Sequence, residues 1–349
     1  MKKTLILLVV LVFVLMSGSL FAACGNDEPA DEGPADEGPA EPVVLKMASA
    51  AMFQYGDVEM AFVDAFNARC GPDYTIEYYG AEQMLSFMEI FDGVRTGVAE
   101  LGAITPNFHS FDEPKLGVVE IPFLFNNLEA HIAAVPGLTP LYAEILEEQF
   151  NQKLLCLHNY TGMALISTQP VYTLEDWDGL LVQAISPIMA SMIEALGGAP
   201  VSGMPYTESY SLMEKGTVDG VITAPAAMVI FALTDVGPYM TSAYMAPALH
   251  GFSINLDVWN DLPGDIQDIM LEEAQKQSDV IDEWLKGEWT KDFALIADAG
   301  VEIYSLPQDE VDRWKDACQS VIDEQMAIYG DFGVQVMEIV DAANSLYPN

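Results

Sequence analysis

The chain has 349 residues, 51% of them hydrophobic, which is enough for two lobes that each bury a core. It carries 53 Asp and Glu residues against 13 Lys and Arg, for a formal net charge of −40. Because no stretch is rich in Lys or Arg, nucleic acid and anionic lipid surfaces are poor candidate partners.

The N-terminus has the pattern of a targeting segment. Two lysines precede an apolar run at 5–16, and small residues then lead to Cys24. The placement of Cys24 resembles a bacterial lipobox, in which the cysteine is lipidated. We therefore expect 1–23 to be a signal peptide and Cys24 to anchor an extracytoplasmic protein to the cell membrane. Plain secretion and an uncleaved anchor are the alternatives, although the apolar run is short for a spanning helix.

An acidic segment follows the cysteine. Residues 26–42 read NDEPADEGPADEGPAEP, with DEGPA occurring twice and no large apolar side chain to bury. Such a composition predicts a disordered, extended tether, here residues 24–42 with the cysteine included. An acidic interaction tail is the alternative.

The first half of the remaining chain alternates between strand and helix patterns. The expected elements are a strand from Val43 that runs into a small-residue loop by Ala50, a helix with Met60, Phe62, Val63 and Phe66 on its apolar side, an alternating strand at 74–79, a helix at 84–96 and a buried strand at 99–104. This alternation predicts an α/β sheet with right-handed crossovers.

The second half continues with longer helices. The expected elements are a helix at 138–150, two strands at 153–158 and 163–167 that carry the chain into a second lobe, a strand at 180–185, a long helix at 265–298, a strand at 301–306, and amphipathic helices at 308–328 and 333–346.

Motifs of catalysis and of metal binding are missing from the sequence. Cys70, Cys156 and Cys318 have no disulfide or zinc spacing, so we expect buried free thiols, with one bridge left open. The histidines at 109, 131, 158 and 250 are scattered, and no nucleophile elbow, zinc-binding helix or phosphate loop occurs. We expect no catalytic residue, no cofactor and no metal; an unrecognised hydrolase site remains an alternative.

A series of short blocks, taken together, carries a family resemblance. The blocks are PFLF at 122–125, LEDWDGL at 174–180, GGAPV at 197–201, MPYTE at 204–208, KGTVDG at 215–220 and INLDVW at 254–259. In order and spacing they resemble the solute-binding proteins of TRAP transporters (the DctP type), over nearly all of 43–349.

The resemblance implies a fold and a role. The fold is α/β and two-lobed, of the periplasmic-binding-protein type (class II), with a hinge between the lobes and a long helix that spans them. It implies lobe I at 43–160 plus 250–290 and lobe II at 161–249 plus 291–349. The role is extracytoplasmic capture of a small molecule for the TRAP membrane subunits, without catalysis. A receptor for a sensor kinase or another transporter, and a secreted lipoprotein enzyme, are the rival interpretations.

The polar anchors of that family are replaced in this chain. The resemblance places two arginines and an asparagine that hold the ligand's carboxylate at Met163, Gln183 and Thr223. The remaining candidates for the cation are three arginines expected on helices or loops away from the cleft: Arg69, Arg95 and Arg313. A carboxylate buried without a paired cation loses several kcal/mol of solvation. We therefore expect a ligand without a dominant carboxylate.

Aromatic residues are the other candidates for lining the cleft. By their place beside the motifs, the expected ligand-binding residues beyond Met163, Gln183 and Thr223 are Phe53, Tyr55, Phe108, Tyr160, Tyr206, Glu208, Tyr244 and His250. Aromatic walls suit a flat or apolar ligand, and with Glu208 or His250 they accommodate a cation. A supporting role in its loop, without ligand contact, is the alternative for Glu208.

Overall fold

The computed structural model describes residues 41–51 and 53–348. The expected signal peptide, Cys24 and nearly all of the expected tether lie outside these residues. Within the described part, no helix combines the length and apolar character that crossing a bilayer requires.

The first sheet has five strands in the order β2-β1-β3-β10-β4. They are β1 (Val43–Ala48), β2 (Tyr74–Tyr79), β3 (Leu101–Ile104), β4 (Gln152–Thr161) and β10 (Ala248–Asn255). β1 is parallel to β2 and β3, whereas β10 runs antiparallel to β3 and β4. Every residue of β3 and β10 is buried, as expected of strands inside a covered sheet. The strand pattern of β10 was not predicted.

Helices and short 3₁₀ turns accompany this sheet. They are α1 (Phe53–Cys70), η1 (Phe87–Glu89), α2 (Ile90–Thr96), η2 (Pro106–His109), η3 (Pro114–Glu120) and α3 (Leu128–Phe150). The helix predicted at 84–96 is thus a 3₁₀ turn followed by a short helix.

Helix α3 begins ten residues before its predicted start. Asn127 is its N-cap, and the side chain accepts a hydrogen bond of 2.9 Å from the backbone N–H of Ala130. Pro136 and Pro140 lie inside the helix. Because prolines normally break helices, the sequence pattern predicted a shorter helix than the structure shows.

The second sheet has six strands in the order β11-β9-β5-β8-β6-β7. The strands are β5 (Ala164–Ser167), β6 (Leu181–Gln183), β7 (Ala199–Val201), β8 (Gly220–Thr223), β9 (Tyr239–Ser242) and β11 (Glu302–Ser305). Its helical elements are η4 (Leu174–Trp177), α4 (Pro187–Leu196), η5 (Tyr206–Glu208), α5 (Ser209–Glu214), α6 (Pro225–Ile230) and η6 (Leu233–Asp235).

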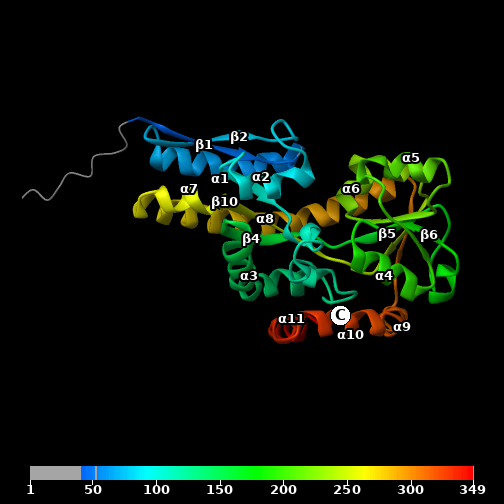
Figure 1. Cartoon of the computed structure of the whole chain (residues 1–349). Coiled ribbons are helices and arrows are strands. Elements are labelled where there is room, and N and C mark those ends of the chain that lie inside the picture. Colours follow the sequence, from blue (N-terminus) through cyan, green and yellow to red (C-terminus); the bar gives the residue numbers. More distant parts are fainter. Residues whose placement is uncertain (1–40, 52, 349) are drawn as a thin grey trace, which may run out of the picture. The chain divides into compact units, whose positions relative to one another are not determined.

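Three segments connect the two sheets. β4 of the first sheet leads into β5 of the second, and the chain returns from β9 into β10. After α7 (Leu256–Asp261) comes the 35-residue helix α8 (Gly264–Asp298). It packs on β4 of the first sheet and the nearby helix α1, and on β11 of the second sheet and the nearby helix α6 (Figure 1). This arrangement confirms the predicted α/β fold and its long spanning helix.

Three helices, not the predicted two, end the chain. They are α9 (Gln308–Ala317), α10 (Gln319–Tyr329) and α11 (Asp331–Leu346). Val336 and Val340 of α11 share a hydrophobic core with Leu138 and Leu146 of α3. The lobe boundaries stay a prediction. Residues 331–346 were predicted to belong to lobe II, but α11 packs on α3, a helix predicted to belong to lobe I.

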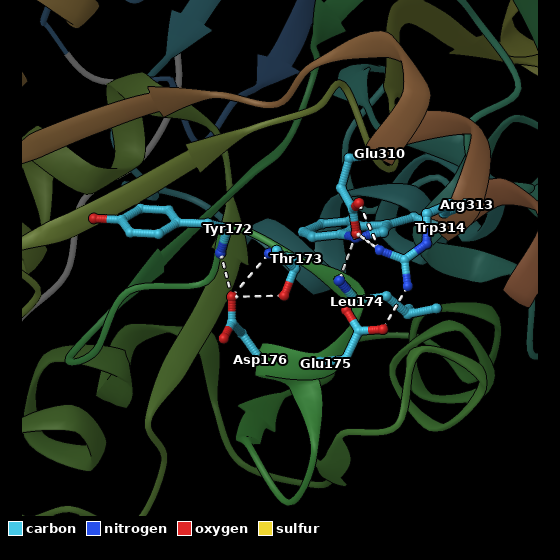
Figure 2. A network of polar contacts seen from close by, with 8 residues as sticks. All are labelled: Tyr172, Thr173, Leu174, Glu175, Asp176, Glu310, Arg313 and Trp314. Carbon is cyan, nitrogen blue, oxygen red and sulfur yellow. Dashed lines mark hydrogen bonds and ion pairs between the residues drawn. The ribbon is translucent and has the colours of Figure 1, made fainter.

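The LEDW block joins α9 to the second sheet (Figure 2). Thr173 and Asp176 form a capping box around η4. Across from them, Glu310 of α9 accepts hydrogen bonds from the backbone N–H of Leu174 at 2.6 Å and from the Trp314 indole at 3.1 Å. The block therefore fixes the C-terminal helix α9 to the second sheet, and we call these contacts the LEDW anchor.

Candidate ligand-binding site

Three aromatic side chains from three elements surround Tyr55 of α1. Its ring makes edge contacts with Tyr160 of β4 and His250 of β10, both at 5.8 Å between centroids, and with Trp284 of α8 at 5.5 Å. Tyr160 also stacks on His250 at 5.2 Å. We call Tyr55, Tyr160, His250 and Trp284 the aromatic cluster. The structure thus brings together three predicted site residues and adds Trp284.

A buried carboxylate lies beside the aromatic cluster. Glu59, one helical turn after Tyr55, is 0% exposed, and its Oε1 is 3.3 Å from His250 Nε2. The Tyr78 hydroxyl donates a 2.8 Å hydrogen bond to Oε2 of Glu59. On the other side of the imidazole, Nδ1 is 2.8 Å from Thr105 Oγ1. These contacts hold the His250 ring in one orientation.

A second acid reaches the cluster from α8. Asp282 Oδ1 accepts a hydrogen bond of 2.9 Å from the backbone N–H of Asn159, the residue before Tyr160. Burial raises the pKa of Asp282 to about 7, and this one backbone bond offsets the effect only in part. The Tyr55 hydroxyl is buried without a hydrogen-bond partner among the described residues.

The second sheet contributes a smaller aromatic and polar group. The Tyr206 hydroxyl is hydrogen-bonded to Thr223 Oγ1, and the Tyr206 ring makes an edge contact with Phe231 at 5.3 Å. Burial raises the pKa of Tyr206, and the hydroxyl of Tyr160 adds to this effect. Tyr160 is thus close enough to Tyr206 to influence the pKa of its hydroxyl.

Gln183 is occupied by protein partners. It is 1% exposed, and its Oε1 accepts a 2.6 Å hydrogen bond from Ser209 Oγ. Its Nε2 donates to the carbonyls of Met204 and Pro205 at 3.4 and 3.3 Å. In this structure the side chain holds the loop before α5, and both its amide nitrogen and its amide oxygen have protein partners.

Met163 belongs to the core of the second sheet. It is 4% exposed and packs in the cluster that contains Trp177 and Trp314. Strand β5 begins one residue later, so the strand-start position that the resemblance assigned to Met163 falls on Ala164. Neither residue offers a charge to a ligand.

The remaining predicted site residues lie in different parts of the structure. Tyr244 packs over Gly162 and its hydroxyl is 3.0 Å from His131 Nδ1. Phe108 makes an edge contact with Phe87 at 5.6 Å. Glu208 is exposed at the end of η5. Phe53 begins α1, and its side chain lies outside the described part.

All three arginines are engaged in ion pairs on helices. Arg69 of α1 pairs with Glu272 at 2.8 Å and also with Glu273, and Arg95 of α2 pairs with Asp92 at 2.9 Å. Arg313 of α9 pairs with Glu175 at 2.5 Å and with Glu310 at 2.7 Å (Figure 2). None of these ion pairs involves a residue of the aromatic cluster or of the Tyr206 group.

A separate hollow of about 400 Å³ has the size of a small-molecule pocket. It is lined by the start of α3, the middle of α8 and the start of α9, and includes Tyr244, Trp289, Lys286 and Lys315. Tyr244 is the one predicted site residue among its walls. In the part of the chain that the structure describes, no group of His, Cys, Asp and Glu side chains is arranged to hold a metal ion.

Sequence reasoning missed Glu59, Thr105, Phe231, Asp282 and Trp284. Glu59 had a local signal, since it follows Tyr55 by four residues on a predicted helix and so shares its face. Asp282 and Trp284 reach the cluster only because α8 packs beside β4.

A fold of two α/β sheets joined by crossing strands and one long helix is typical of a solute-binding protein. Residues 46–328 match the model of the DctP family, described as bacterial extracellular solute-binding protein, family 7. This match covers most of the chain, and the protein belongs to that family.

Individual relatives agree with this membership. A solute-binding protein of Sulfitobacter sp. is 29% identical over 47% of this chain and 50% of its own length. The C4-dicarboxylate-binding periplasmic protein DctP of Rhodobacter capsulatus is 22% identical over 87% of this chain and 92% of its own. The crystal structure of DctP7, a Bordetella pertussis receptor binding pyroglutamic acid, superposes with a TM-score of 0.79 at 18% identity, over 86% of this chain and 99% of DctP7.

The class of protein follows from the family. The chain is an extracytoplasmic solute-binding protein of the TRAP type, which binds a small organic molecule and works with membrane transporter subunits. It is a receptor and not an enzyme.

Proposed function

We propose that the solute is bound between the aromatic cluster and the Tyr206–Thr223 pair, and that it is not a simple mono- or dicarboxylate. The observation that supports this proposal is that Gln183 and the three arginines already have partners within the protein. Gln183 is bonded to Ser209 and to loop carbonyls, and the three arginines are paired elsewhere. None of the three arginines is therefore placed to offset the desolvation of a carboxylate in this site.

The comparison proteins sharpen the contrast. By their names, the Rhodobacter capsulatus protein binds C4-dicarboxylates and DctP7 binds pyroglutamic acid, and both ligands carry carboxylates. In this chain the fold is kept, while the positions that the resemblance assigns to basic anchors hold apolar or neutral side chains. We propose that the same receptor architecture has been adapted to a different class of solute.

We propose that the solute is trapped by closure of the two lobes. β4, β10 and α8 join the sheets, and Tyr160, His250 and Trp284 lie on these three elements. A solute that contacts them together with Tyr206 has different contacts in open and closed forms, and this difference drives closure.

We also propose that Cys24 carries a lipid that keeps the receptor at the membrane. The support is the leader pattern before Cys24 and the acidic tether after it. Mass spectrometry of the protein extracted from membranes tests this directly. A diacylated N-terminal cysteine is expected, and the Cys24→Ala protein is expected in the soluble fraction; an unmodified Cys24 contradicts the proposal.

A thermal-shift screen tests the solute class. The panel contains simple carboxylates, neutral polyols, aromatic compounds and amines, because a ligand that binds the folded state raises the melting temperature. We expect no stabilisation by simple mono- or dicarboxylates. If those are the compounds that stabilise the protein, the proposal about the solute is wrong.

A further inference from the structure

We propose that the solute is a small organic cation, an amine or a quaternary ammonium compound, whose positive group lies against Asp282 and the rings of Tyr55, Tyr160 and Trp284. This inference rests on the proposed binding site and names the class of solute that the site takes. It also assigns a specificity-determining role to Asp282 of α8.

The first argument is the placement of the acids. Glu59 is fully buried next to His250, and Asp282 reaches the peptide group before Tyr160. The two acids come from different helices, and each contacts a residue of the aromatic cluster or the residue next to one. Of the two, Glu59 already has Tyr78 and His250 as partners, whereas Asp282 has one backbone N–H. Asp282 is therefore the acid with hydrogen-bonding capacity left for a ligand.

The second argument is the local field around the rings. Burial is the main cause that raises the pKa of the Tyr55 hydroxyl, and the two carboxylates Glu59 and Asp282 are among the further causes. Glu59 also raises the pKa of Tyr160. With Glu59 beside His250 and Asp282 beside the peptide group before Tyr160, an ionised acid here attracts a cation and repels an anion.

The third argument is how the nearby base is used. Lys286 lies one helical turn after Asp282 on α8, and its charge lowers the pKa of Asp282. Its ammonium group, however, forms a 2.8 Å bond to Glu283. It therefore does not neutralise Asp282 in a contact pair, and a ligand cation can take that place.

The fourth argument is the chemistry of the rings. Tyr160 and Trp284 are each within 6 Å of Tyr55 between centroids, and the Tyr55 hydroxyl is buried without a partner in the described part of the chain. Electron-rich rings grouped beside a carboxylate bind organic ammonium ions through cation–π and Coulomb attraction. The unpaired hydroxyl gives an N–H or O–H of the solute an acceptor.

Isothermal titration calorimetry with defined probes tests the inference on the mature chain. Choline and putrescine are the cationic probes, xylitol is a neutral one and succinate an anionic one. We expect at least one cation to bind, and its affinity to fall as NaCl is raised, because salt screens the attraction. Binding of xylitol without either cation, or of no probe, overturns the inference. Binding confined to succinate overturns the proposed solute class as well, so the two failures are distinguishable.

Variants assign the role of Asp282. Asp282→Asn keeps the size of the side chain and an acceptor for the Asn159 N–H, but removes the charge. We expect it to weaken binding of the cation about tenfold or more. Asp279→Asn, on the exposed side of the same helix, is the matched control and is expected to leave affinity within about threefold. Equal affinities for the two variants overturn the role of Asp282.

A pair of variants tests the rings. Tyr55→Phe keeps the ring and loses the hydroxyl, while Tyr55→Leu loses the ring. We expect affinity for choline to fall about 3- to 30-fold in Tyr55→Leu and clearly less in Tyr55→Phe. Circular dichroism and the melting temperature verify that each variant is folded. Equal losses in the two variants contradict a cation–π contact at Tyr55.

Discussion

The hydroxyl of Ser209 donates a hydrogen bond of 2.6 Å to the side-chain oxygen of Gln183, where the family resemblance expected an arginine. Gln183 ends β6, and Ser209 begins α5. The bond therefore joins the end of a strand to the start of a helix. The position to which the resemblance assigns ligand binding contributes here to the internal structure around the second sheet.

This relationship predicts an effect on stability. Gln183→Leu conserves volume but removes the acceptor of Ser209 and the donor of the loop carbonyls. We expect the free energy of unfolding to fall by about 1–3 kcal/mol, as for a buried hydrogen bond that loses one partner. Urea denaturation of Gln183→Leu, Ser209→Ala and the double variant measures the coupling, expected at about 0.5–1.5 kcal/mol. Additive effects of the two single changes would show that the bond is unimportant.

The Glu310 contacts predict a difference between two neighbouring residues of α9 (Figure 2). Glu310→Ala leaves the Leu174 N–H and the Trp314 indole without their acceptor, so we expect a loss of about 1–3 kcal/mol. Arg313→Ala breaks partly exposed ion pairs, and we expect less than about 1 kcal/mol. Chemical denaturation measures both.

Ligand affinity provides the control for these two changes. Because the LEDW anchor shares no contact with the aromatic cluster, both variants are expected to bind solute as the unchanged protein does. A specific loss of affinity in Arg313→Ala, with stability unchanged, contradicts the assignment of Arg313 to this anchor.

Glu120 predicts a pH dependence of stability. Burial raises its pKa from 4.5 to about 7, while Ser186 and a 2.7 Å hydrogen bond from Asn107 act in the opposite direction. The folded state therefore binds this proton more tightly than the unfolded state. Its contribution is full below about pH 4.5 and is lost as pH rises toward 7. We expect a loss on the order of 2 kcal/mol between pH 5 and pH 8.

Glu120→Gln separates this effect from the general repulsion of a highly acidic protein. The amide keeps an acceptor for Asn107 and cannot ionise, so the fall of stability with pH is expected to be shallower. Glu208→Gln, at an exposed position, is the matched control and is expected to follow the unchanged protein. Melting temperatures measured from pH 5 to pH 8 give the slopes; equal slopes for all three proteins contradict the prediction.

The fold could be predicted from the sequence because its main elements have strong local patterns. The alternation at Tyr74–Tyr79 gives a strand with those bounds, and the long apolar periodicity gives α8 within one residue at its start. β10 lacks alternation because both of its faces are buried, and α3 contains two prolines in its interior. In both cases tertiary packing outweighs the local signal.

The candidate site could be predicted less well, for a physical reason. Loop and strand-end positions such as Tyr55, Tyr160 and His250 follow from the order of elements, and the structure brings these three together. Asp282 and Trp284 depend on where α8 crosses β4, which no local pattern encodes. The motif at Gln183 indicates its position but not its partners, so its bond to Ser209 could not be foreseen.

The crossing between β4 and β5 gives a prediction about Gly162. A Cβ atom there would overlap the ring of Tyr244, whose hydroxyl contacts His131. Gly162→Ala must therefore displace a buried ring, and we expect a loss of about 1–3 kcal/mol in unfolding free energy, as for overpacking in a core. Gly264→Ala is the control: nothing lies near its Cβ at the start of α8, so a small gain of about 0.4–1 kcal/mol is expected. Urea denaturation measures both, and a Gly162→Ala protein as stable as Gly264→Ala would show that the Tyr244 ring moves aside freely.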